Sequence, residues 1–225
     1  MNIKKLKLFL LGLPKTFLFN FHYFDFKTAV KFPVWLTHKV RLKSLKGIVH
    51  LETSQIRRGM ISIGFAHVSI NDTNEYSLWN VEGTVIFNGR AQFGAGSKIA
   101  VGKKARLKIG DNFLITARTE IACFKEITFG KDCLLSWDIL IMDTDAHPIF
   151  SDSGDRINHD QPIKIGSHSW IGCRSTILKG TILPNNTIVG AYTLISKKFV
   201  EENSVIVGNA ATVVKRNVNF PVENY

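Results

Sequence analysis

His147 is the residue of this sequence best suited to acid–base chemistry. It lies in the segment "DTDAHPIFSDSGDRINHDQ" (143–161), where two carboxylates, Asp143 and Asp145, precede it. A histidine can accept a proton near neutral pH, and a neighbouring carboxylate can hold the imidazole in the accepting tautomer. Proximity to the histidine favours Asp145 for that role, and a solvated acidic loop face is the alternative interpretation of both carboxylates.

The cysteines indicate neither a metal site nor a disulfide framework. Cys123, Cys133 and Cys173 are odd in number and form no CxxC pair, so a zinc knuckle or a disulfide scaffold is not expected. We expect reduced, mostly buried thiols in a cytoplasmic protein.

A six-residue repeat determines which parts of the chain can position His147. An aliphatic residue stands at every sixth position in one long run: Ile165, Ile171, Ile177, Leu183, Val189 and Ile195. Neither a helical period nor the alternation of a strand selects every sixth position. A chain that turns a corner at each hexapeptide does, and three hexapeptides close one triangular coil. The small residue that often follows each aliphatic one would let the corner turn.

The repeat is interrupted once. Upstream the phase appears from Ile109 to Ile127 and slips by two positions to reach Phe129 and Ile141. Between Ile141 and Ile165 the sixth positions are polar, so this stretch cannot fill an aliphatic stack; they are His147, Ser153 and His159. Residues 143–161 are therefore predicted to form an external loop. We expect a basic, aromatic arm or cap over residues 1–60 and an all-β solenoid domain over residues 61–225.

The net charge of +11 is concentrated in the segment 1–60. That segment holds 12 Lys and Arg against two acidic residues, Asp25 and Glu52, whereas the segment 61–225 holds 17 Lys and Arg against 16 Asp and Glu. A basic arm on a nearly neutral body argues against a nucleic-acid-binding protein.

The pattern of the N-terminal segment predicts neither a cleavable signal peptide nor a membrane-spanning helix. Its apolar stretch ends at Pro14 and Lys15, and no small-residue cleavage site follows. Nine aromatic residues interleaved with lysines lie between Phe9 and Trp35. They fit an interfacial segment on an anionic membrane surface, reached through residues 1–45, and equally a cap on the domain core.

Three motifs resemble the hexapeptide-repeat acyltransferases. They are "DAHP", the run "PIKIGSHSWIGCRSTILKGTILPNNTIVGAYTLISKKF", and "VIVGNAATVVKR". The resemblance implies a left-handed parallel β-helix, acetyl-CoA as cosubstrate, no metal and a homotrimer. The wording "SWDILIMDTDAH" is most similar to the acetyltransferases of polysaccharide and capsule gene clusters.

The resemblance also implies roles for individual residues. His147 would be the general base, and the backbone N–H of Cys173 would bind the oxyanion. Trp170 matches an aromatic residue of the substrate cleft, with a corner aromatic in surface contacts as the alternative. The coenzyme would lie along the coil edges at Gly172, Gly190, Ala191 and Ser196, with its phosphates on Lys197, Lys198, Lys215 and Arg216. For the last two, a solvated basic terminus is the alternative.

We therefore expect a cytoplasmic acetyl-CoA-dependent O-acetyltransferase whose acceptor is a saccharide hydroxyl. A small-molecule or amino-sugar N-acetyltransferase of the same fold is the alternative enzyme, and a β-solenoid binding scaffold is the alternative outside enzymes. A three-histidine zinc enzyme of this fold is not expected, because His67, His147, His159 and His168 lack the required spacing.

Overall fold

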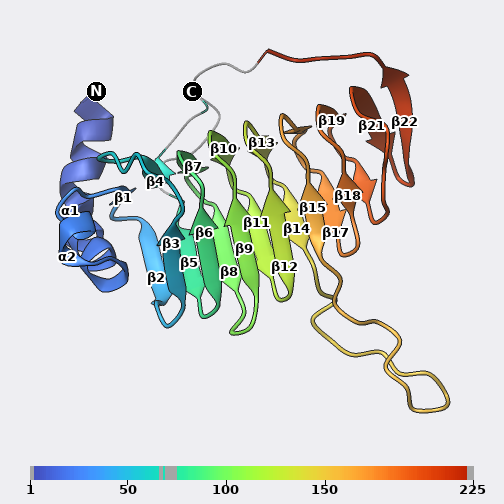
Figure 1. Cartoon of the computed structure of the whole chain (residues 1–225), viewed down its shortest axis with the longest axis horizontal. Helices are drawn as coiled ribbons and strands as arrows, with labels where there is room; N and C mark the ends of the chain where they lie inside the picture. Colours follow the sequence, from blue (N-terminus) through green and yellow to red (C-terminus); the bar gives the residue numbers. More distant parts are fainter. Residues whose placement is uncertain (1–2, 66–67, 69–74, 222–225) are drawn as a thin grey trace.

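The computed structural model describes residues 3–65, 68 and 75–221, and His67 lies outside them (Figure 1). In this part of the chain the strands form three sheets, and each coil adds one strand to each sheet in turn. All strand pairs are parallel except the last pair of the largest sheet. The all-β solenoid expected from the repeat is confirmed.

We name the sheets A, B and C in the order in which the chain visits them. Sheet A contains β1 (Val34–Leu36), β4 (Ile61–Phe65), β7 (Ala91–Gly94), β10 (Phe113–Ala117), β13 (Leu134–Trp137), β16 (Trp170–Ile171), β19 (Thr187–Val189), β21 (Ser204–Gly208) and β22 (Ala211–Arg216). Sheet B contains β2 (Val40–Ser44), β5 (Ser77–Val81), β8 (Lys98–Val101), β11 (Glu120–Cys123), β14 (Leu140–Met142), β17 (Thr176–Leu178) and β20 (Leu194–Ile195). Sheet C contains β3 (Ile48–Leu51), β6 (Thr84–Phe87), β9 (Arg106–Ile109), β12 (Glu126–Phe129), β15 (Ile163–Ile165) and β18 (Ile182–Leu183).

The strand registers explain the hexapeptide phase and its slip. Ile165 pairs with Leu183, three hexapeptides further along the chain, and the inward side chains of the later coils are at most 2% exposed. Ile109 pairs with Phe129, two positions beyond three hexapeptides. The slip of two positions is therefore a longer coil, and the solenoid continues through it.

The corners of the coil are turned by residues other than those expected. At the C–A corner, where the chain passes from sheet C to sheet A, Asn112, Asp132 and Asn186 adopt φ of 56°, 57° and 55°. Asn and Asp tolerate this left-handed conformation better than most residues. Gly110 precedes the turn, and a Cβ there would lie 2.2 Å from the carbonyl oxygen of the next coil. The expectation that the small residue turns the corner is wrong here, because this glycine serves close stacking.

The solenoid begins earlier than residue 60. Two helices, α1 (Ile3–Tyr23) and α2 (Phe26–Ala29), precede β1, and β1, β2 and β3 form the first coil. Val34 pairs with Ile61, well over three hexapeptides away, so an irregular coil length hides the repeat. The boundary between arm and solenoid therefore moves to about residue 33. Among the described residues, no helix combines the length and apolar character needed to cross a membrane.

Candidate functional site

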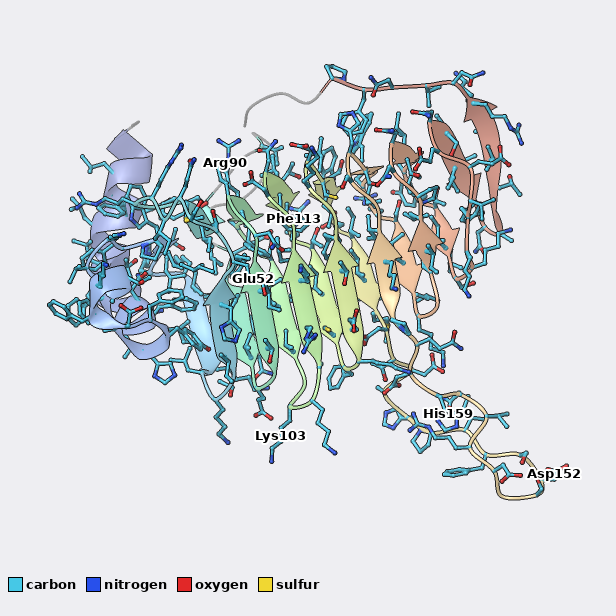
Figure 2. All side chains as sticks on the ribbon, viewed as in Figure 1. Glu52, Arg90, Lys103, Phe113, Asp152 and His159 are labelled. Carbon is cyan, nitrogen blue, oxygen red and sulfur yellow. The ribbon has the colours of Figure 1, made fainter. Side chains whose placement is uncertain are left out.

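The segment that carries His147 leaves the solenoid between β14 and β15, as the interrupted repeat predicts (Figure 1). It projects from the B–C corner, where the chain passes from sheet B to sheet C. In Figure 2 its residues Asp152 and His159 lie on the same edge of the molecule as Lys103, which occupies this corner two coils earlier. We call residues 143–162 the projecting loop.

Asn158 holds the two strands of the projecting loop together. Its side-chain amide donates to a carboxylate oxygen of Asp145 and to the carbonyl oxygen of His147, both at 2.8 Å. Its side-chain oxygen accepts the N–H of Ile149 at 2.6 Å. Lys179, on the solenoid, forms an ion pair with the same carboxylate oxygen of Asp145. The base of the loop is thus fixed by polar contacts to itself and to the coil.

The backbone directly before His147 is strained. Ala146 adopts φ of 62°, a region that costs a non-glycine residue roughly 1–2 kcal/mol. The turn is closed because the N–H of Ala146 donates to the Thr144 hydroxyl at 3.0 Å and that of His147 donates to the Asp145 carbonyl at 2.7 Å. Thr144 in turn donates to Asp160 at 2.7 Å. These contacts fix the direction in which the His147 side chain leaves the loop.

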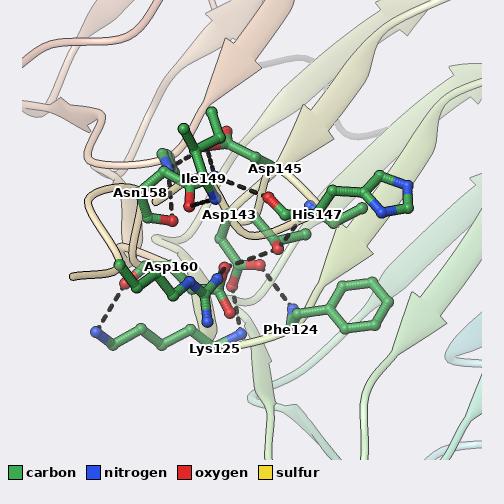
Figure 3. Close-up of polar contacts among 12 residues, drawn as sticks. Phe124, Lys125, Asp143, Asp145, His147, Ile149, Asn158 and Asp160 are labelled. Carbon is green, nitrogen blue, oxygen red and sulfur yellow. Dashed lines mark hydrogen bonds and ion pairs between the residues drawn. The ribbon is translucent and has the colours of Figure 1, made fainter. Parts of the chain in front are cut away.

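The His147 side chain is exposed and available. Its ring forms no hydrogen bond with any described residue, although its backbone is held on both sides. Figure 3 shows the imidazole projecting to the same side as the ring of Phe124, which is 50% exposed. The imidazole can therefore accept a proton from a bound molecule, and an aromatic surface lies on the same side.

The two flanking carboxylates do not hold the imidazole in the described structure, which corrects the expectation for both. Asp143 is fully buried and accepts the N–H groups of Phe124 and Lys125, at 2.6 and 2.8 Å (Figure 3). Burial raises the pKa of Asp143, and these hydrogen bonds oppose the rise. Asp145 faces Lys179 and Asn158, whose hydrogen bonds lower its pKa. The Asp143 carboxylate therefore binds the backbone after β11, and the Asp145 carboxylate binds two side chains at the base of the loop.

The backbone N–H of Cys173 is free for an oxyanion. It lies at the A–B corner, between sheets A and B, where the neighbouring N–H groups of Gly172 and Arg174 donate to Val189 and Trp137. Within the described residues, the N–H of Cys173 has no acceptor, and one coil later the N–H of Ala191 has none either. Two unused donors thus stand one above the other at this corner.

Gly172 and Gly190 are explained by coil stacking. A Cβ on Gly172 would lie 2.6 Å from the nitrogen of Ala191, and one on Gly190 would lie 2.6 Å from a methyl group of Val207. Both contacts are within the protein. Coil stacking thus requires glycine at both positions, and the role of these glycines beside a coenzyme stays a prediction.

Trp170 lies on sheet A and is partly covered by the chain itself. Its indole N–H donates to the Ser136 hydroxyl at 3.2 Å, and its ring centroid lies 6.0 Å from that of Phe220. Phe220 also stacks on His168, at a centroid distance of 4.4 Å. Trp170 remains 38% exposed. This placement fits a surface aromatic as well as a substrate contact.

The predicted phosphate ligands fall into two groups. Ser196, Lys197 and Lys198 follow β20 at the B–C corner, and all three are exposed. Lys215 and Arg216 end β22, and the guanidinium of Arg216 is paired with Glu201 at 2.5 Å. Arg216 is therefore the least available of these cations.

The predicted residues occupy different corners of the triangular coil. His147 and Lys197 belong to the B–C corner, whereas Cys173 and Ala191 belong to the A–B corner. A hollow of about 720 Å³ lies at the C–A corner and contains none of them. One protomer therefore does not bring the base and the free N–H donors into one cleft.

The cysteines and candidate metal ligands show no further chemistry. The three cysteines are free, Cys123 and Cys133 are buried, and burial raises the pKa of Cys133 to about 12. In the part of the chain that the structure describes, no group of three His, Cys, Asp or Glu side chains is arranged to hold a metal ion.

The sequence patterns missed three residues around His147. Asn158 and Lys179 fix the base of the loop, and Phe124 presents its exposed ring beside it. Phe124 follows the run of buried strand β11 at a corner, which signals exposure. Asn158 and Lys179 carry no such signal, because both act on Asp145, which is 13 and 34 positions away from them.

Comparisons with known proteins find relatives that match parts of this chain. No protein-family model matches the chain. A polysialic acid O-acetyltransferase of Neisseria meningitidis is 50% identical over 56 residues, which are 24% of this chain and 26% of that protein. A polysialic acid O-acetyltransferase of Escherichia coli O1:K1 / APEC is 33% identical over 125 residues, 55% of this chain and 38% of that protein.

The fold has a solved counterpart. The polysialic-acid-specific acetyltransferase NeuO matches 84% of this chain and 78% of its own, with a TM-score of 0.50 and 22% identity. This likeness, together with the three parallel sheets, shows the left-handed β-helix fold. The chain spans only about a quarter and two-fifths of the two sequence relatives named above.

Proposed function

We propose that this chain is a hexapeptide-repeat acyltransferase and that it transfers an acetyl group from acetyl-CoA to a saccharide hydroxyl; its partial sequence relatives and its fold support this. His147 would be the general base. The saccharide class comes from the two relatives, which are named as polysialic acid O-acetyltransferases.

The proposal rests on the exposure of the His147 imidazole and on the contacts that fix its backbone. His147 combines an exposed, unbonded imidazole with a backbone fixed by Asn158 and by the turn at Ala146. A surface histidine without a role needs neither a strained residue before it nor a buried amide beneath it. Such pre-arrangement is what a proton acceptor in a bimolecular reaction requires.

The reaction follows from these groups. The acceptor oxygen attacks the thioester carbonyl carbon while an imidazole nitrogen of His147 takes the hydroxyl proton. The negative charge that develops on the carbonyl oxygen is stabilised by the N–H of Cys173. When the carbon–sulfur bond breaks, the imidazolium returns its proton to the leaving thiolate, and an acetyl ester and free coenzyme A result. No covalent enzyme intermediate is needed, and Cys173 contributes its backbone.

The acyl-CoA site is expected between protomers of a homotrimer. The base and the free N–H donors lie at different corners of one coil, so a second copy must bring its A–B corner to the projecting loop of the first. Ala191 and Ser196 would pair with the pantetheine arm, while Lys197, Lys198 and Lys215 would attract the phosphates.

Free thiols persist in a reducing compartment, and acetyl-CoA is available there, so we propose a cytoplasmic location for the enzyme. The acceptor is then a polysaccharide, a glycolipid or a nucleotide-sugar precursor available on that side of the membrane.

The activity is tested by incubating the purified full chain with acetyl-CoA and a panel of free sugars, nucleotide sugars and oligosaccharides, and measuring thiol release. We expect release above the hydrolysis rate with a saccharide and an ester in the product. Release only with amine acceptors would replace the proposal by N-acetyl transfer. Intact-mass measurement without acceptor should show no acetylated protein, and an acetyl adduct lost in C173A would overturn direct transfer.

The placement of the site is tested by mixing two inactive variants. H147A lacks the base, and A191W blocks the A–B corner. If each site combines His147 of one protomer with the A–B corner of another, mixed oligomers regain activity because some sites are intact. No recovery in oligomers shown to be mixed would place the site within one protomer.

A further inference from the structure

The face of α1 that packs on the solenoid combines the buried ring of Phe19, 5.3 Å from that of Trp79, with two polar side chains. The Thr16 hydroxyl accepts the N–H of Leu36 at 2.9 Å, and the Asn20 side chain bonds both the N–H and the carbonyl of Val34, at 3.1 and 2.8 Å. A Cβ on Gly12 would lie 1.9 Å from the carbonyl oxygen of Leu36, so the helix rests directly on β1. This face satisfies the free edge of sheet A, which would otherwise present unpaired groups.

The opposite face of α1 is apolar and exposed. Its residues are between 40% and 54% exposed: Leu6, Leu10, Leu11, Leu13, Phe17 and Leu18. We call these six residues the α1 apolar face. A surface helix of a water-soluble protein places its apolar stripe towards the core and its polar residues outward. Here Phe19 alone among the described large apolar side chains of α1 is fully buried, and six others lie outward, because Gly12, Thr16 and Asn20 occupy the rest of the packing face.

The apolar surface continues onto α2 through a cluster of phenylalanines. Phe17 stacks on Phe21 at 4.2 Å between ring centroids, and Phe21 contacts the rings of Phe26 and Phe32, each at 6.1 Å. Phe26 is 75% exposed. A contiguous patch of this kind on a soluble chain marks an interaction site.

The charge around this patch is of one sign. Residues 1–31 contain six lysines and one acidic residue, Asp25. Lys7 lies on the exposed side of α1, and Lys27 and Lys31 are exposed beside the phenylalanine cluster. Contact between two copies of this face would bring like charges together, whereas an anionic lipid surface complements them.

The patch lies at one end of the coil stack, where it can contact a flat surface such as a membrane. Figure 1 shows α1 lying across the N-terminal end of the coil stack, at the opposite end from β21 and β22, with the projecting loop well away from it. A surface bound there leaves His147 accessible. The six residues span about 12 positions, or roughly 18 Å of helix, which is enough for an interfacial helix.

We propose that the α1 apolar face docks the protein on an anionic lipid bilayer, with α1 lying in the plane of the interface and the lysines on the headgroups. This inference does not depend on the proposed acetyl transfer. In a trimer whose axis is parallel to the coil stack, the three patches face the same way, and simultaneous binding increases the avidity.

The test is flotation of the full chain with vesicles of phosphatidylcholine alone, or of phosphatidylcholine and phosphatidylglycerol mixed two to one. We expect binding to the anionic vesicles, with weaker binding at high salt. L10S/F17S should lower the vesicle affinity at least tenfold, because two apolar side chains leave the acyl boundary. K7Q/K27Q/K31Q should lower it on the order of 100-fold, at about fivefold per lysine.

A matched control distinguishes the effect of the α1 apolar face from that of losing exposed apolar residues elsewhere. V200S/V214S removes two exposed apolar residues at the far end of the stack, 86% and 50% exposed, and should leave vesicle binding unchanged. Circular dichroism and thermal melting confirm that each variant folds. If wild type does not bind anionic vesicles, or binds them no better than L10S/F17S does, the proposal is overturned. If L10S/F17S instead changes the oligomer size in sedimentation velocity, the face is an interface between copies.

Discussion

The coils after residue 163 and the projecting loop share the six-residue phase of the sequence, but they are stabilised by different interactions. In the coils each sixth residue is a buried aliphatic side chain, such as Ile171 and Ile177, both 0% exposed. In the loop the sixth positions are His147, Ser153 and His159, and all are exposed. The coils are held by apolar burial, and the loop is held by Asn158 and an ion pair.

This difference separates stability from chemistry. Removing apolar volume from a coil should lower the free energy of unfolding without changing the arrangement of the loop. Removing a polar group from the loop should change the rate of the proposed reaction while the solenoid remains folded.

H147A should lower kcat by on the order of 10²–10⁴, because no other group takes the acceptor proton. The melting temperature should stay within about 2 °C of wild type, because the imidazole makes no hydrogen bond to a described residue. H159A alters an exposed histidine of the same loop and should retain near-wild-type turnover. Equal losses in the two variants would remove the assignment.

I177A should destabilise the fold by about 2–5 kcal/mol, measured by urea unfolding, since Ile177 is fully buried between Ile141 and Ile195. I149A is the control in the projecting loop, where Ile149 is 53% exposed, and it should change stability by less than about 0.5 kcal/mol. A larger loss of stability in I149A than in I177A would contradict the view that apolar burial stabilises the coils but not the loop.

N158A should lower kcat by about 10- to 100-fold, because three hydrogen bonds that orient His147 are lost. KM for acetyl-CoA should be unchanged, since the hydrogen bonds of Asn158 within the described residues are to Asp145, His147, Ile149 and Lys179 and to none of the predicted coenzyme residues. A rise in KM with constant kcat would show that Asn158 serves binding instead.

Acid should loosen the base of the loop before the solenoid. Lys179 and Asn158 lower the pKa of Asp145 below its ordinary value of 3.8, so its ionised contacts are present above that value and are lost as pH falls through the lower, folded-state pKa. Hydrogen exchange of residues 143–162, corrected for its intrinsic pH dependence, should accelerate below about pH 4. D145N should show fast exchange at both pH 5 and pH 3.

A146G should have the smallest effect. Glycine relieves the strain of φ at 62° but adds freedom to the unfolded chain, so the stability should change by less than about 1 kcal/mol. A146V should be clearly less stable, because a branched side chain fits this conformation poorly. Equal melting temperatures of the two variants would show that the turn adapts.

Much of this site could be predicted because the repeat is strict. Where three hexapeptides close each coil, aliphatic spacing locates every corner, and a break in the pattern locates the loop. The start of the first coil was missed because its strand β1 pairs with β4 across a much longer stretch of chain. The roles of Asp143 and Asp145 were also missed, because nearness in sequence does not say which way a side chain points.

Periodicity and charge alone established a triangular solenoid, an external loop with a histidine, and a basic N-terminal segment, since each is a property of residue order. The fold decided which groups meet. It turned Asp143 inward to bind two N–H groups, set Asn158 beneath His147, and put Cys173 at another corner. It also turned Thr16 and Asn20 of α1, together with Phe19, towards the open edge of β1 and left the leucines outside.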